Sequence, residues 1–312
     1  MSLSIGIVGL PNSGKSTLFN AVLKRQIAQV AEYPYTTIEP NIGVVEVPDK
    51  RLSLLATSLS IQKIVPAAIR FIDIAGLVKG AHQGEGLGNQ FLAHIREVDA
   101  ILQVVRAFEN SQVPHVAGKV DPREDIEIVN LELELAEIKK PTIYVLNMDE
   151  KSITESAGIK SIRELIFDKS KSKGLGQDGV VIPVCAKLEA ELSDLSEEEQ
   201  KAYLKEVGIE KSGLDQVISA SYKLLDLITF FTIAGGKMVQ AWPVKVGTKM
   251  IEAAEIVHSD FARGFITAEV CDWQKLVEVG SWHEAREKGL IHFAGRDEIA
   301  KDGEVVEFKF RA

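Results

Sequence analysis

"GLPNSGKS", residues 9–16, is the stretch of this sequence that decides the fold. It matches the pattern G-x-x-x-x-G-K-[ST], it follows the strand-like run "SIGIVGL" (4–10) and it opens the helix-like run "KSTLFNAVLK" (15–24). Gly9 and Gly14 permit backbone conformations in which successive N–H groups converge on phosphate oxygens at a helix N-terminus. The alternative is a glycine-rich turn without chemistry, but a chance match in this chain has odds of only roughly one in a hundred. We therefore interpret the stretch as a phosphate-binding loop.

The side chains of the loop have separate expected roles. Lys15 neutralises the β- and γ-phosphates, and the Ser16 hydroxyl ligates Mg²⁺. Asn12 either stabilises the loop or holds a potassium ion that spreads the transition-state charge. The residues expected to contact the nucleotide here are Asn12, Ser13, Gly14, Lys15, Ser16 and Thr17.

Two later segments complete the expected phosphate and metal site. "DIAG" ends a predicted strand, so that Asp73 would hold Mg²⁺ through water and the Gly76 amide would sense the γ-phosphate. "YPYTTIEPN" supplies Thr36 and Thr37 in a proline-flanked loop, and of the two we favour Thr37 for Mg²⁺. The predicted magnesium ligands are Ser16, Thr37 and Asp73.

Hydrolysis also needs a group that positions the attacking water. A glutamine commonly follows the "DIAG" glycine in this class of site, but Leu77 stands there and cannot hydrogen-bond water. His82, in the glycine-rich "KGAHQGEGLGN", is the nearest candidate, the alternative being a solvated loop histidine. The predicted catalytic set is Lys15, Gly76 and His82, with slow intrinsic turnover.

The stretch "NMDE", residues 147–150, follows the strand-like "PTIYVL" where a guanine-binding GTPase would carry Asn-Lys-x-Asp. Met148 replaces the lysine and Glu150 replaces the aspartate that accepts two hydrogen bonds from guanine. Adenine would leave a strict guanine acceptor unpaired, so its loss relaxes discrimination against ATP. Asn147 and the Met148 main chain can still meet the adenine edge. ATP is therefore expected to bind at least as tightly as GTP.

The order of predicted elements gives the fold class. Up to about residue 227, strands alternate with helices, which predicts an α/β domain with a mostly parallel sheet. From there short aromatic and β-branched strands surround one helical piece, "KMIEAAEIVHSDF", which predicts an α+β module. The predicted domains are residues 1–227 and residues 228–312.

Composition excludes several classes of protein. The chain has 312 residues, a net charge of −9, 46% apolar residues and two distant cysteines, which indicates a soluble protein with reduced thiols. No apolar run reaches the length of a membrane span, and the N-terminus lacks a signal-peptide pattern. We expect a cytoplasmic monomer. Lys245, Lys249 and Arg263 lie among aromatic residues, a modest pattern for RNA contact.

With "GLPNSGKSTLFNAV", "YPYTTIEPNIGVVEVPD", "FIDIAGLVKGAHQGEGLGNQFLAHIREVDAILQVVRAF" and "DPREDIEIVNLELELAEI", the chain closely resembles the Obg-like ATPase family, YchF. The match continues through "PVCAKLEAEL" and "FFTIAGGKMVQAWPVKVGTK" and covers nearly the whole chain. The resemblance implies a P-loop G domain followed by a ubiquitin-like β-grasp (TGS) domain, ATP and GTP hydrolysis, and ribosome association. It also implies that Cys185, Ala186 and Lys187 help to bind the nucleotide.

The sequence departs from the family at one place. The family carries an antiparallel helical arm before the "PTIYVLN" strand, whereas Ile138 here is followed at once by Lys139, Lys140 and Pro141. Two readings other than a ribosome-associated ATPase stay open. One is a nucleotide-dependent ribosome- or RNA-binding module with negligible turnover, and the other is a GTP-specific switch.

Overall fold

The computed structural model describes residues 3–24, 41–74, 87–154, 180–209 and 211–311. The chain divides into two compact units. The first comprises Met1–Glu46 and Ile69–Leu225, and the second comprises Val47–Ala68 and Asp226–Ala312. The prediction of one continuous domain over 1–227 is therefore wrong for residues 47–68, which belong to the second unit.

The first unit is built on a six-stranded sheet in the order β2-β4-β1-β5-β6-β7. Its strands are β1 (Ser4–Val8), β2 (Ile42–Glu46), β4 (Ala68–Asp73), β5 (Ala100–Arg106), β6 (Thr142–Asn147) and β7 (Val180–Val184). β1 pairs in parallel with β4 and β5, and β6 pairs in parallel with β5 and β7. These five strands consequently bring their carboxyl ends to one edge of the sheet, where α/β proteins bind ligands.

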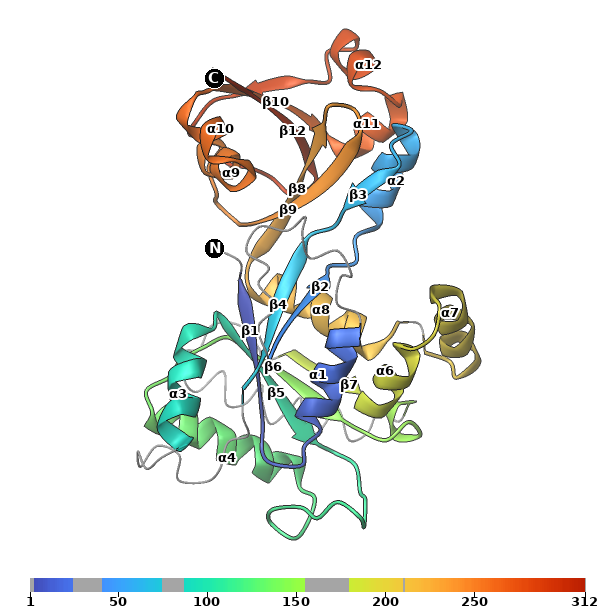
Figure 1. Ribbon diagram of the computed structural model, residues 1–312, viewed down its shortest axis with the longest axis vertical. Helices are drawn as coiled ribbons and strands as arrows, with labels where there is room; N and C mark the ends of the chain where they lie inside the picture. The colour runs from blue at the N-terminus through green and yellow to red at the C-terminus, as the bar shows by residue number, and fades with distance from the viewer. Residues whose placement is uncertain (1–2, 25–40, 75–86, 155–179, 210, 312) are drawn as a thin grey trace. The chain divides into compact units, whose positions relative to one another are not determined.

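Helices cover both faces of this sheet (Figure 1). They are α1 (Lys15–Lys24), α3 (Leu87–Glu97), α4 (Pro122–Leu135), α6 (Ala186–Leu192), α7 (Glu197–Glu206) and α8 (Gly213–Leu224), with a short 3₁₀ turn η3 (Ser152–Thr154). α3 and α4 lie on one side and α1 and α6 on the other, and Ile95 of α3 and Val129 of α4 share one apolar cluster. The P-loop α/β class predicted from the sequence is confirmed.

The connection from α4 to β6 is short. Residues 136–141 join the two elements, and the backbone folds back on α4 where the Ile138 N–H donates to the Leu133 carbonyl at 2.9 Å. Lys140 fastens the connection to the end of α3 by donating to the Val98 carbonyl at 2.6 Å. The chain therefore passes from α4 to β6 without the helical arm expected near residues 138–140.

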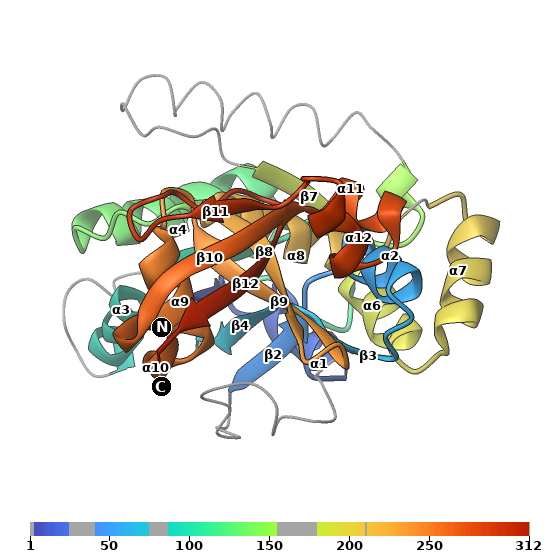
Figure 2. The same cartoon turned by 90° about the horizontal axis from the view of Figure 1, so that it is seen from above.

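The second unit has a six-stranded sheet in the order β11-β10-β12-β8-β9-β3. Its elements are α2 (Lys50–Ser58), β3 (Lys63–Val65), β8 (Leu227–Ala234), β9 (Met238–Lys245), α9 (Met250–Val257), α10 (Ser259–Arg263), β10 (Phe265–Asp272), α11 (Trp273–Val279), α12 (Trp282–Glu287), β11 (His292–Ala294) and β12 (Glu304–Phe310). β12 runs parallel to β8, and the β8–β9 and β10–β12 pairs are antiparallel. α9 buries Met250, Ala253 and Ala254 against this sheet, with α10 beside it (Figure 2). This is the β-grasp arrangement that the resemblance implies.

Residues 47–68 join the second unit through pairing and polar contacts. β3 extends the sheet by pairing in parallel with β9, with Lys63 opposite Met238. Arg51 of α2 donates to Asp302 at 2.7 Å, and its guanidinium lies 5.3 Å from the centre of the Phe231 ring. A three-residue strand and a nine-residue helix carry too little periodicity to reveal such an assignment. Among the described residues, no helix is long and apolar enough to cross a membrane.

Candidate functional site

The phosphate loop joins β1 to α1 through backbone that requires glycine. Gly9 has φ +153° and Gly14 has φ +99°, and both values lie in the region that residues with a side chain rarely adopt. A Cβ on Gly9 would lie 2.3 Å from the Val104 carbonyl oxygen, and one on Gly14 would lie 2.1 Å from Asn147 Nδ2. The loop therefore presses against β5 and β6, and these contacts fix its shape.

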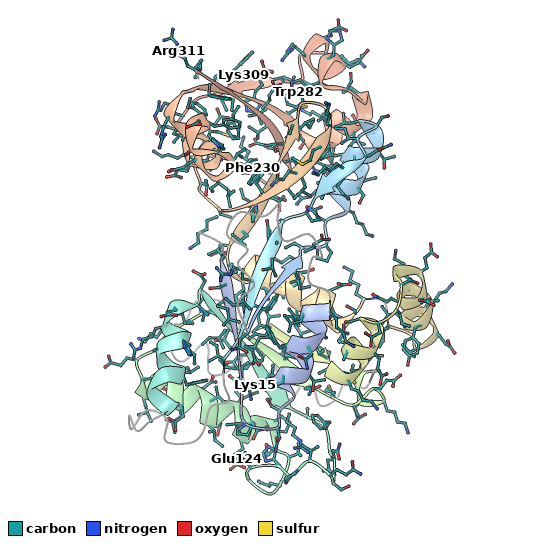
Figure 3. The ribbon with its side chains drawn as sticks, viewed as in Figure 1. Lys15, Glu124, Phe230, Trp282, Lys309 and Arg311 are labelled. Atoms are coloured by element: carbon teal, nitrogen blue, oxygen red, sulfur yellow. The ribbon has the colours of Figure 1, made fainter. Side chains whose placement is uncertain are left out.

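Two opposite charges lie at the carboxyl edge of the sheet. Lys15 begins α1 (Figure 3), is only 8% exposed, and donates from Nζ to the Leu10 carbonyl at 2.9 Å. Burial lowers the pKa of Lys15, and the charge of Asp73 opposes that effect. Burial likewise raises the pKa of Asp73, with Lys15 opposing. Each charge is thus only partly compensated by the other, which suits a site that receives phosphates and a cation.

Oxygen and amide groups near this pair fit a nucleotide and Mg²⁺. Ser16 and Thr17 are exposed at the start of α1, so that the Ser16 hydroxyl and the Asp73 carboxylate present the oxygen donors that Mg²⁺ prefers. The Ser13 hydroxyl is buried and has no hydrogen-bond partner within the part of the chain that the structure describes. Asn12 Nδ2 donates to the Pro114 carbonyl at 3.0 Å, so this side chain is tied to a neighbouring loop. That contact favours the loop-stabilising role of Asn12.

Several residues of the predicted site belong to stretches that the structure does not describe. Thr36 and Thr37 lie in residues 25–40, and Gly76, Leu77 and His82 lie in residues 75–86, all outside the described residues. Their roles stay predictions.

Asn147 joins three segments of the site. Its Nδ2 donates to the Ser13 carbonyl at 2.9 Å, and its Oδ1 accepts from the Ala186 N–H at 3.0 Å. The Met148 N–H donates to the Val184 carbonyl at 2.8 Å, so it is engaged in the sheet and is not free to meet a base. Asn147 therefore holds the phosphate loop, the end of β6 and the start of α6 together.

The side chains of the other residues predicted to contact the base interact with neighbouring protein groups. Glu150 accepts from the Tyr203 hydroxyl of α7 at 2.9 Å. Cys185 caps α6 by accepting from the Leu188 N–H, and burial raises the pKa of its thiol. Lys187 is exposed and lies 3.9 Å from Glu191 on the same helix. The structure thus brings Cys185 and Ala186 to the edge where Asn147 lies, while the Lys187 ammonium faces a carboxylate of its own helix.

No sequence pattern pointed to the polar loop that follows β5. Arg106 is 2% exposed and donates to the carbonyls of Phe108 and Val113. His115 Nδ1 accepts from the Ala117 N–H, so Nε2 carries the proton and donates to Asp125 at 3.0 Å in a buried pair. Because Asn12 bonds to Pro114, this His–Asp pair lies one residue from a contact with the phosphate loop. A lone histidine in a polar loop has no periodic pattern by which to find it.

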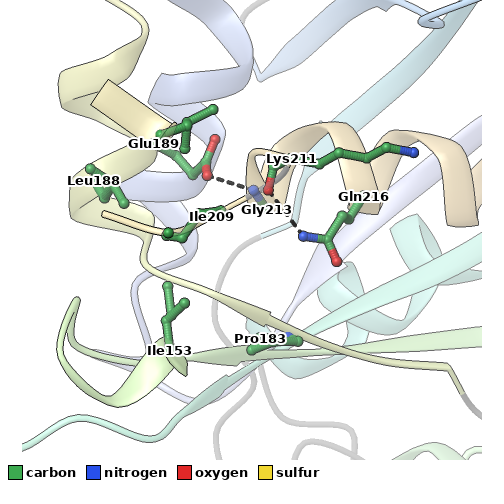
Figure 4. Close-up of a pocket in the computed structure, with 10 residues that line it drawn as sticks. Ile153, Pro183, Leu188, Glu189, Ile209, Lys211, Gly213 and Gln216 are labelled. Atoms are coloured by element: carbon green, nitrogen blue, oxygen red, sulfur yellow. Dashed lines mark hydrogen bonds between the residues drawn. The ribbon is translucent and has the colours of Figure 1, made fainter. Parts of the chain in front are cut away.

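The described part of the first unit also contains a cavity of about 320 Å³ (Figure 4). It is lined by Ile153, Pro183, Leu188, Glu189, Leu204, Gly208, Ile209, Lys211, Gly213 and Gln216. Inside it, Glu189 accepts from the Gly213 N–H at 2.7 Å. None of the predicted nucleotide-binding residues lines this cavity, so it is separate from the predicted nucleotide site.

Basic residues predicted for RNA contact are partly neutralised. Lys249 pairs with Asp297 at 2.8 Å, and Arg263 lies 3.5 Å from Asp260. Only Lys245, of the three, has no ion pair within the described residues, so the predicted RNA contact has little support from these side chains.

Comparison with known proteins gives consistent matches. A family model described as "50S ribosome-binding GTPase" matches residues 4–148, and the model of the C-terminal domain of YchF GTPases, described as a protein of unknown function, matches residues 227–311. The "Ribosome-binding ATPase YchF" of Bacillus subtilis is 41% identical over 371 positions, covering 99% of this chain and 100% of the relative. That of Haemophilus influenzae is 40% identical over 371 positions, with 99% of each chain covered. Both alignments exceed the 312 residues of this chain, so these relatives carry residues with no counterpart here.

A solved structure agrees. The YchF GTPase of Schizosaccharomyces pombe superposes with a TM-score of 0.82 at 30% identity, covering 99% of this chain and 98% of that one. The phosphate loop, the two-unit architecture and these matches together show that the chain belongs to the YchF family of P-loop NTPases.

Proposed function

We propose that this protein binds and hydrolyses ATP, with GTP used less or equally well, in a Mg²⁺-dependent reaction that acts as a switch on the ribosome. The observation that carries the proposal is the phosphate loop. Its buried Lys15 feels the charge of Asp73, and the neighbouring base loop lacks the guanine-reading aspartate. Relatives named as ribosome-binding ATPases support both the nucleotide and the partner.

The described residues suggest how the nucleotide is held. Lys15 Nζ exchanges the Leu10 carbonyl for β- and γ-phosphate oxygens, whose negative charge adds to that of Asp73 in compensating the buried ammonium. Ser16 and Asp73, with Thr37, hold Mg²⁺, which when bound neutralises the charge developing on the transferring phosphoryl group. His82 remains our candidate for positioning the attacking water, because Leu77 offers no hydrogen bond.

A link between the nucleotide site and the second unit supports the switch role. Thr37 precedes β2 and Asp73 ends β4. The residues from the end of β2 to the first residue of β4, 47–68, are part of the second unit. A displacement of Thr37 or Asp73 on nucleotide binding or hydrolysis would therefore be transmitted to the β-grasp sheet through the covalent chain. We assign ribosome contact to that sheet, in a cytoplasmic, monomeric protein.

Phosphate release from ATP and GTP, measured with and without ribosomes, tests the proposal. We expect slow ATP turnover that ribosomes accelerate, and ATP should displace bound GTP at equal or lower concentration. Binding of ATP without phosphate release under any condition would instead favour a nucleotide-dependent binding module, which Leu77 makes the second candidate. Much tighter binding of GTP than of ATP would contradict the assignment of the base loop.

A further inference from the structure

A tyrosine from a separate helix holds the Glu150 carboxylate. Tyr203 of α7 donates its hydroxyl to Glu150 Oε1 at 2.9 Å. This hydrogen bond raises the pKa of the Tyr203 phenol above its ordinary value, so the group stays a donor throughout the neutral range. Oε1 is thus engaged by a neutral partner that lies 53 residues further along the chain.

The tyrosine ring is anchored independently of Glu150. Tyr203 packs against an apolar cluster formed by Cys185, Leu188, Leu192 and Leu204. α7 is capped by Ser196, whose hydroxyl and backbone form a capping box with Glu199. The packing of α6 and α7 therefore sets the position of the hydroxyl, and the glutamate side chain adapts to it.

The backbone on both sides of Glu150 is also fixed. Before it, the Met148 N–H is bonded to the Val184 carbonyl in the sheet. Beside it, Asp149 Oδ1 accepts from the Ser152 N–H at 2.9 Å and from the Ser152 hydroxyl at 2.8 Å. What remains adjustable is the direction of the Glu150 side chain, and Tyr203 sets that direction.

This arrangement bears on which base is read. A carboxylate that reads guanine accepts from N1–H with one oxygen and from the 2-amino group with the other, whereas adenine offers neither donor at those positions. We propose that Tyr203 is a positioning residue that sets base selectivity by holding the Glu150 carboxylate away from that bidentate role. The inference rests on the proposed function, in which residues 147–150 form the base loop of a bound adenine nucleotide.

Binding of ADP and GDP to the full chain, measured by isothermal titration calorimetry, tests the assignment. Tyr203→Phe removes the hydroxyl and keeps the ring, so we expect GDP affinity to rise about threefold to tenfold, the effect of one hydrogen bond, with ADP affinity unchanged. In a Glu150→Ala background the same substitution should change neither affinity. Glu150→Asp, whose shorter side chain loses the tyrosine, should raise GDP affinity as well.

Tyr144→Phe is the matched control, because it also removes a tyrosine hydroxyl bonded to a side chain, Asn130 at 3.2 Å, in the same unit. It should leave the ratio of ADP to GDP affinity as in the wild type. An unchanged ratio in Tyr203→Phe, or an equal change with and without Glu150, overturns the assignment while leaving ATP hydrolysis intact. Wild-type protein that binds neither nucleotide overturns the proposed function and this inference with it.

Discussion

Lys15 and Asp73, at the predicted nucleotide site, are charged groups whose burial the folded protein compensates only in part. Within the described residues, Lys15 donates to one backbone carbonyl, and the charge of Asp73 only partly offsets the effect of burial on its pKa. Replacing Lys15 by alanine removes the group that neutralises the β- and γ-phosphates, so ATP hydrolysis should fall by about 10²–10³-fold. Lys24→Ala, at the other end of α1 and paired with the exposed Asp194, should stay within about twofold of the wild type. Steady-state phosphate release for the two variants measures this difference.

Asp73 gives a stability prediction with a defined sign. Its folded-state pKa is raised from 3.8, so the unfolded chain ionises first as the pH rises, and the native state loses stability through that window. Asp73→Asn should therefore raise the free energy of unfolding of the nucleotide-free protein at pH 7. The gain should disappear only as the pH falls to about 3, where the aspartate is largely protonated in both the folded and the unfolded state. Urea unfolding at the two pH values checks this, and a variant less stable than wild type at pH 7 contradicts it.

At the scale of elements, Asn147 is the joint between the phosphate loop, β6 and α6. Asn147→Ala leaves the Ser13 carbonyl and the Ala186 N–H without their buried partner, so we expect a loss of about 2–4 kcal/mol in the free energy of unfolding. Asn130→Ala, which removes a half-buried hydrogen bond to Tyr144, should cost only about 1 kcal/mol. Urea midpoints for both variants at one pH give the comparison. Equal losses would mean that Asn147 has no special structural role.

Elements with strong periodicity or a motif could be predicted from the sequence. β1, β4, β6 and α1 lie close to their expected places, because buried parallel strands read as apolar runs and the loop motif marks the start of α1. α2, α6, α7 and α8 were not predicted, since they are short or lie in mixed polar sequence. Asn147 is predicted from the sequence as a base contact. In the structure its side-chain amide bonds instead to Ser13, 134 residues away, and to Ala186, 39 residues away. Only the folded sheet brings these residues together, so the sequence offers no pattern for the two hydrogen bonds.

At the scale of the whole molecule, the two units are not two consecutive stretches of chain, because residues 47–68 of the second unit interrupt the first. Val47–Ala68 buries Leu52, Leu55 and Val65 within the second unit. A fragment ending at Leu225 would expose these side chains, each worth about 1.5–3 kcal/mol when buried, so it should aggregate and unfold with little cooperativity. Size-exclusion chromatography and thermal melting followed by circular dichroism measure both properties.

The control for this fragment comes from the ends of the segment. The Val47 N–H donates to the Ala67 carbonyl at 2.8 Å, so the chain leaves and re-enters the first unit at adjacent points. Replacing residues 48–66 by a short Gly-Ser turn in the same fragment should give a soluble protein that melts cooperatively. If both fragments behave alike, residues 47–68 do not depend on the second unit.

The pairing of β3 with β9 also has a consequence for how the protein is made. Domains generally fold from the N-terminus during synthesis, and every strand of the first sheet leaves the ribosome before β9 does. In the nascent chain, Leu52, Leu55 and Val65 therefore lack the partners that bury them in the folded protein until the last quarter of the polypeptide has been synthesised. Pairing of β3 with β9 is therefore a late step of folding, and the apolar side chains of residues 47–68 stay without their native partners until the second unit has been synthesised.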